Sequence, residues 1–308
     1  MIRSKGFSLV ELAVALAIIA LLLAGAMIPL STQIDVRNVT DTQRAMESIR
    51  EAIIGFAQAN GRLPCPADGS VPAGAAGAGT EQVTGNSCTA ANSASCTAVN
   101  GAVPCSVVPW ATLGVPETDA WGRRFTYRVS PAFADAVILT TWNTRLSAYT
   151  PPLGNLPQAV SSPTSPANQT PACDLTVTPT LSSFALCTLG DIAVFTRGAP
   201  GPAVASGVAL PAVIISHGKN GFGAFTPRGG APLAAPIGAD EIANATGTTQ
   251  ATPTGGYLSW AFFSRTPTPR ASPCNDAAGP SFCEFDDAVV MITSNLLIAR
   301  MVAAGRLP

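Results

Sequence analysis

The chain opens with a short charged segment and then a long apolar run. Residues 1–6 carry Arg3 and Lys5, and residues 7–28 contain one charged side chain, that of Glu11. A helix needs about 20 apolar residues to cross a bilayer, so residues 7–28 predict a transmembrane helix. The positive charges in front of it place the N-terminus in the cytoplasm and the rest of the chain on the other side of the membrane.

A second helical pattern follows directly in residues 29–60. Its apolar residues recur at spacings of three, four and seven: Val39, Met46, Ile49, Ile53 and Phe56. Asn60–Gly61 predicts the end of the helix. We expect one nearly continuous helix from Phe7 to Ala59. Its second half would pack one face on a globular domain, since the repeat is too short for a free-standing coiled coil.

The remainder, residues 61–308, alternates short strand candidates with long loops rich in small residues. Stretches 67–103, about 150–180 and about 227–256 read as loops. A last helix is expected from Ser294, as N-cap, to just before Gly305. The strand candidates are Arg124–Val129, Ala136–Trp142, Asp191–Arg197, Ala209–Ser216, Leu258–Ser264 and Ala288–Thr293. The predicted fold class is α+β: a long N-terminal helix packed on an antiparallel sheet with disulfide-tied loops.

Charge and cysteine content narrow the class of protein. The net charge is -1 and only 11% of residues are charged, which argues against binding a nucleic-acid backbone. The chain has eight cysteines, all after residue 60, and an even number behind an export signal predicts disulfides in an oxidising compartment. Proximity along the chain suggests Cys88–Cys96, Cys173–Cys187 and Cys274–Cys283, which leaves Cys65–Cys105. Many other pairings are open, so this set is a hypothesis.

Glu11 is the unusual residue of the apolar run. A carboxylate in a membrane span costs about 2.5–3.5 kcal/mol on insertion scales, and the span offers no Lys or Arg to pair with it. The simplest partner is a charge on another chain. Two buried opposite charges are tolerable together and costly apart, so such a pair would also favour correct register between subunits.

The segment Gly6-Phe7-Ser8-Leu9-Val10-Glu11 resembles the cleavage and methylation motif of type IV prepilins and type II secretion pseudopilins. The resemblance implies that prepilin peptidase cuts after Gly6 and methylates the new amine of Phe7. It also implies that Glu11 pairs with the N-terminal amine of a neighbouring subunit during filament assembly. An ordinary secretory signal is the alternative, since Ala24-Gly25-Ala26 resembles its cleavage site. Glu11 and the Gly6–Phe7 junction favour the prepilin interpretation.

Three downstream segments are similar to runs of the major pseudopilin family, in the same order but at longer intervals: 119–127, 216–221 and 238–242. The chain thus resembles an enlarged relative with inserted loops. In that family the loops after the sheet hold calcium, so the resemblance implies Asn220, Asp240 and Glu241 as candidate ligands. No D-x-D-x-D loop is present, and we favour a solvated loop with no cofactor.

No convergent catalytic set is visible in the sequence. His217 is the only histidine, and no G-x-S-x-G elbow accompanies it. Glu284, Asp286 and Asp287 form the densest acidic cluster. Asp286 and Asp287 are neighbours at the start of a strand, so their side chains should face opposite ways, against a catalytic carboxylate pair. The sequence therefore predicts a protein that is not an enzyme.

Together these observations predict a minor pilin or pseudopilin, a structural subunit of a type IV pilus or type II secretion filament. The expected organisation is a leader peptide (1–6), a transmembrane helix (7–28), an amphipathic stem helix (29–60) and a periplasmic or extracellular domain (61–308). Its expected partners are prepilin peptidase, other pilin or pseudopilin subunits and the bacterial inner membrane. An adhesin or binding module on a pilin stem is the alternative, and an exported enzyme is the least supported.

Overall fold

The computed structural model describes residues 8–84, 87–88, 106–134, 182–184, 188, 190, 192–251 and 258–307; for residues 22–32 and some strand and helix ends it describes only the backbone. The predicted strand 136–142 lies outside these ranges. Within the part of the chain that is described, no helix combines the length and apolar character that a membrane crossing requires.

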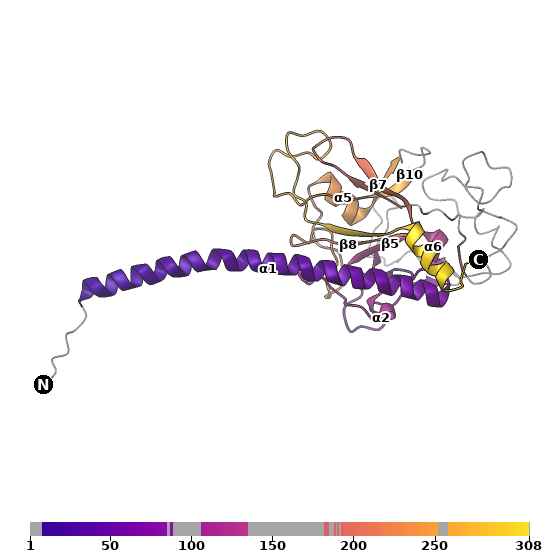
Figure 1. Cartoon of the computed structure of the whole chain (residues 1–308), viewed down its shortest axis with the longest axis horizontal. Coiled ribbons are helices and arrows are strands. Elements are labelled where there is room, and N and C mark those ends of the chain that lie inside the picture. Colours follow the sequence, from indigo (N-terminus) through magenta and orange to yellow (C-terminus); the bar gives the residue numbers. More distant parts are fainter. Residues whose placement is uncertain are drawn as a thin grey trace.

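One long helix, α1 (Leu9–Asn60), dominates the structure and matches the predicted continuous helix closely. Ser8 is its N-cap, and the helix ends at Gly61, whose φ of 72° is left-handed and suits a residue without a side chain. The N-terminal half of α1 projects away from the rest of the molecule, whereas its C-terminal half lies along the globular body (Figure 1).

The C-terminal half of α1 packs by the face that its sequence pattern predicts. Met46, Ile49 and Ile53 are fully buried against α6 (Ser294–Ala303), β11 (Ala288–Ile292) and β8 (Ala212–Ser216). Val39 departs from the prediction and is 44% exposed. The body therefore covers the stem from about residue 42 onward and leaves the preceding turns open.

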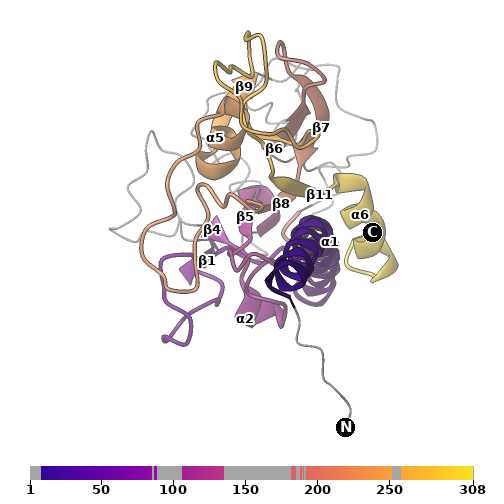
Figure 2. The same ribbon diagram turned by 90° about the vertical axis from the view of Figure 1, so that its left-hand side faces the viewer.

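A five-stranded antiparallel sheet lies across α1, with the strand order β1-β4-β5-β8-β11. Figure 2 shows β5, β8 and β11 side by side above the helix. Aliphatic residues of β8 and β11 pair directly, as at Ile214 and Val290, which explains why the sheet buries one face on α1. The strands not yet given bounds are β1 (Ala67–Asp68), β4 (Ser106–Val107) and β5 (Thr126–Val129).

The sequence predicted a single sheet, but the structure has a second sheet with the strand order β7-β6-β10-β9. Its β6–β10 pair is parallel and its other pairs are antiparallel. Helix α5 (Ala239–Thr246) packs on β10 (Leu258–Phe263). The remaining elements are β2 (Val83–Thr84), β3 (Ser87–Cys88), α2 (Trp110–Leu113), α3 (Pro131–Ala134), β6 (Ile192–Thr196), β7 (Val204–Leu210) and β9 (Thr248–Ala251). The α+β class is confirmed.

Three local predictions need correction. The predicted strand 209–216 is split, because Ala209 has a φ of 54° and Pro211 follows it, so β7 ends before β8 begins. The predicted loop 227–256 contains α5 and β9. The N-cap of α6 is Thr293, whose hydroxyl accepts the Leu296 N–H, while Ser294 donates to the Ala209 carbonyl instead.

Two disulfides are described, and one differs from the hypothesis. Cys274–Cys283 forms as predicted. Cys65, however, bonds to Cys88 with the Cα atoms 5.3 Å apart, so the pairings Cys65–Cys105 and Cys88–Cys96 are wrong. The β2–β3 hairpin carries Cys88 back to the end of α1, a long-range approach that spacing along the chain does not reveal. Cys96, Cys105, Cys173 and Cys187 lie outside the described ranges.

Candidate functional site

Three carboxylates from distant parts of the sequence converge where β11 begins. Asp286 and Asp287 directly precede β11, and Glu241 lies in the first turn of α5, where the helix dipole favours negative charge. One oxygen from each carboxylate lies within 4.8 Å of the others. The fold thus gathers three acidic groups beside the turn 217–221 that follows β8.

Hydrogen bonds hold these carboxylates against that turn. Asn220 Nδ2 donates to Glu241 Oε1 at 3.0 Å, and its backbone N–H donates to Asp286 Oδ2 at 2.8 Å. The Asp286 N–H donates to Glu241 Oε1 at 3.0 Å. Asp287 Oδ2 accepts from Asn244 Nδ2 at 2.9 Å. Every donor in this set is neutral, so the bonds position the negative charges without cancelling them.

Burial and mutual repulsion make Glu241 and Asp286 hold their protons more tightly than free carboxyl groups do. Burial raises the pKa of Glu241 to about 7, and the Asp287 carboxylate adds to the rise while the Asn220 amide opposes it. Burial also raises the pKa of Asp286 to about 6; the Asn220 N–H opposes this rise, and the Asp287 charge reinforces it. Glu241 is only 2% exposed and Asp287 6%. Such a site is stabilised by a proton or by a bound cation.

The residues fit a hard divalent cation. Calcium takes six to eight oxygen ligands from carboxylates, amide and backbone carbonyls and water. Here three carboxylates converge, and Asp286 Oδ1 is buried with no hydrogen-bond donor in the described structure. A buried acceptor without a partner is costly, and a cation would remove that cost. Glu241, Asp286 and Asp287 would be the ligands, and the ion would join α5 to β11.

Of the three ligands that the sequence resemblance implied, Asn220 and Glu241 come together and Asp240 does not. Asp240 Oδ1 accepts from Arg197 Nε at 3.0 Å, and its Oδ2 accepts from Arg265 Nε at 2.8 Å. Adjacent residues of a helix point about 100° apart, so Glu241 and Asp240 serve different networks. The expectation that Asp286 and Asp287 face opposite ways is wrong, since an oxygen of each lies within 4.8 Å of the other and of Glu241. The pairing of β8 with β11 is what brings Asp286 to Asn220.

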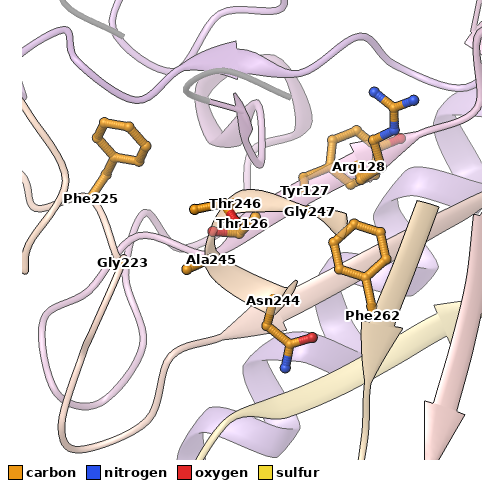
Figure 3. A pocket seen from close by; sticks show the side chains of 10 residues that line it. All are labelled: Thr126, Tyr127, Arg128, Gly223, Phe225, Asn244, Ala245, Thr246, Gly247 and Phe262. Atoms are coloured by element: carbon orange, nitrogen blue, oxygen red, sulfur yellow. The ribbon is translucent and has the colours of Figure 1, made fainter. Parts of the chain in front are cut away.

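A hydroxyl, an imidazole and a carboxylate also lie next to one another at this end of the strands. Thr126 Oγ1 lies 2.8 Å from His217 Nε2, and His217 Nδ1 lies 3.6 Å from Asp287 Oδ1. The recess beside Thr126, lined also by Asn244 and Phe262 (Figure 3), has a volume of about 30 Å³, enough for water only. Ligand pockets usually span about 300–1,000 Å³, so this recess is too small to hold one.

At the other end of the molecule, Glu11 closes a capping box with Ser8. The Ser8 hydroxyl accepts the Glu11 N–H at 3.2 Å, and Glu11 Oε2 accepts the Ser8 N–H at 2.9 Å. Glu11 is exposed, and its carboxylate sits at the positive end of the helix dipole. Within the described residues, this carboxylate is bonded only to the backbone N–H of Ser8. Gly6 and Phe7 lie outside the described residues.

Comparison with known families identifies this N-terminus. The family model described as the prokaryotic N-terminal methylation motif matches residues 1–27. No curated protein and no solved structure matches the chain. The motif, at the head of a long helix that packs on an α+β domain, supports a precursor of the type IV pilin or pseudopilin type.

Proposed function

We propose that this protein is a minor pilin or pseudopilin, a structural subunit of a type IV pilus or a type II secretion filament. One observation carries the proposal: the methylation motif at residues 1–27 stands at the start of the long helix α1. The first half of this helix projects away from the folded domain, and its second half packs on that domain. A helix of this form can pack laterally on its neighbours while the domain stays at the surface of the filament.

In the proposed mechanism, prepilin peptidase cleaves after Gly6 and methylates the amine of Phe7 in the inner membrane. The apolar stems then associate side by side, with the domain of residues 61–308 in the periplasm. Glu11 exchanges its bond to the Ser8 N–H for the amine of a neighbouring subunit, a stronger charge-assisted bond. Because residues 61–308 make a bulky domain for a repeating shaft, the subunit has a low copy number.

The domain itself has no catalytic role in this proposal. The carboxylates of Glu241, Asp286 and Asp287 serve as a structural site for a divalent cation of the calcium type, which ties three chain segments together. The support is the buried Asp286 Oδ1, which has no partner among the described residues, and the raised pKa values of Glu241 and Asp286.

The test is the mature N-terminus, determined by intact mass and N-terminal sequencing from cells that contain prepilin peptidase. A chain that begins at methylated Phe7 supports the proposal. A chain that begins at Met27 shows signal-peptidase cleavage and overturns it. Two variants separate these routes: Gly6→Leu should block prepilin processing, whereas Ala26→Leu should leave it unchanged.

A further inference from the structure

A groove of about 660 Å³ runs between the stem helix and the outer edge of the five-stranded sheet. One wall is α1 from Val39 to Glu47, and the other is the segment from Asp286 to Val290. The loop from Ser264 to Pro267 and the side chain of Trp121 complete the lining. This volume is far larger than the recess beside Thr126 and lies within the range of ligand-binding sites.

The strand that borders this groove has one unused edge. β11 is the last strand of its sheet and pairs only with β8 among the described strands. No described residue outside β8 forms a hydrogen bond with the backbone of Ala288–Ile292. Both faces of β11 are packed, since Val290 contacts the core around α1 and Val289 contacts the core of the second sheet. Among the described residues, nothing pairs with the row of outward N–H and C=O groups of β11.

The sequence of this edge leaves it able to pair. Natural edge strands are usually protected by charges, proline or bulges, and β11 (Ala-Val-Val-Met-Ile) has none of these along its pairing with β8.

The position of the groove indicates where the occupant comes from. The stem surface that leads into it carries exposed apolar side chains, with Ile34 59%, Val36 61% and Val39 44% exposed. In the proposed function this stem is the surface on which subunits meet. The groove therefore continues the subunit interface toward the sheet, and a segment of the adjoining subunit is the chain best placed to enter it.

We propose that an extended segment of a neighbouring filament subunit adds to the sheet along the free edge of β11, in the groove beside α1. Strand addition gives affinity through main-chain hydrogen bonds and specificity through alternate side chains. The part of β11 that lines the groove, Ala288–Val290, spans roughly 10 Å, at about 3.4 Å per residue. The fitting strand is apolar and β-branched, and carries no acidic residue at the end that meets Asp286 and Asp287, because like charges repel there.

This inference rests on the proposed filament function, and the experiment separates the two. A photo-cross-linking residue is placed in the full-length chain at Gln43, an exposed residue that lines the groove, and as a control at Ser48, which is exposed on α1 outside it. Both chains are expressed in cells that assemble the filaments, and sheared filaments are analysed by mass spectrometry. Hydrogen exchange of the amides of β11 is compared between the filament and the unassembled protein.

We expect the Gln43 chain, and not the Ser48 chain, to cross-link to an extended segment of another filament subunit. The outward amides of β11 should exchange about tenfold or more slowly in the filament. A Gln43 cross-link that maps to a neighbour's stem helix, or β11 exchange that does not change on assembly, overturns strand addition and leaves the filament function standing. If neither the Gln43 variant nor the Ser48 variant is found in the filaments, both strand addition and the filament function are overturned.

Discussion

The guanidinium of Arg265 donates through Nε to Asp240 Oδ2 at 2.8 Å, and these two side chains are 1% and 0% exposed. Arg265 Nη2 also donates to Asp276 Oδ1 at 3.1 Å, within the loop closed by Cys274–Cys283. The rings of Phe282 and Phe285 lie 4.2 and 4.3 Å from the guanidinium carbon. This network fixes α5 to the disulfide loop and so positions Glu241 beside β11.

Breaking this pair should destabilise the domain strongly. Arg265→Met leaves the buried carboxylate of Asp276 without its cation and leaves Asp240 with Arg197 alone, and removing one partner of a buried pair costs about 3–5 kcal/mol. Exposed Arg270 is the control, and its change to Met should alter the free energy of unfolding by no more than about 0.5 kcal/mol. Urea denaturation measures both. Equal effects of the two changes would show that the buried pair contributes little.

The acidic cluster should make stability depend on pH when divalent cations are absent. The folded pKa values of Glu241 and Asp286, about 7 and about 6, exceed their usual values of 4.5 and 3.8, so the folded state binds protons more tightly than the unfolded state. This contribution to stability is complete below about pH 4 and is lost as the pH rises through 6 and 7. The melting temperatures of the wild type and of Glu241→Gln are measured in EDTA from pH 4 to 8. Their difference should show this loss of stability as the pH rises. A difference that is constant across this range contradicts the assigned shifts.

Calcium should replace the protons of the same cluster. At pH 7.5 we expect the melting temperature to rise with calcium concentration, because a ligand that binds only the folded state stabilises it by mass action. Asp286→Asn should abolish most of this rise, since it removes one ligand carboxylate. Glu51→Gln, a change at an exposed residue on α1, is the control and should keep the full response. An unaltered response in Asp286→Asn would place the ion elsewhere.

The bridge between Cys65 and Cys88 should be both present and stabilising. Non-reducing peptide mapping should recover these two residues in one linked peptide. Replacing both with Ser should lower the free energy of unfolding by about 2–4 kcal/mol, because the bridge restricts the unfolded chain. Recovery of Cys65 linked to Cys105 would instead restore the pairing that sequence spacing suggested.

Glu11 should be needed for assembly and not for processing. Glu11→Ala removes the proposed partner of the neighbouring amine, so this variant should be processed to Phe7 and retained in the membrane but be absent from sheared filaments. Ser8→Ala is the matched control: it removes the side-chain half of the capping box and leaves the carboxylate in place. Immunoblots of membrane and filament fractions measure both. Normal incorporation of Glu11→Ala would contradict the pairing.

Several features of this protein follow from local sequence alone. The methylation motif, the long helix and its end at Gly61 depend on short segments and on periodicity, and the structure and the family comparison agree with them. The buried face of Met46, Ile49 and Ile53 follows from helical spacing in the same way. Cys274–Cys283 closes a short loop, so proximity along the chain was a sufficient guide to this bridge.

Tertiary structure decided what depends on contacts between distant segments. The partner of Cys65 is set by a hairpin, and the division into two sheets by the break at Ala209 and Pro211. The acidic site needed the pairing of β8 with β11 and the packing of α5, which bring Asn220, Glu241 and Asp286 together across 66 residues of sequence. Local pattern fixes which face of an element is apolar, but only the packing of elements decides which polar groups meet.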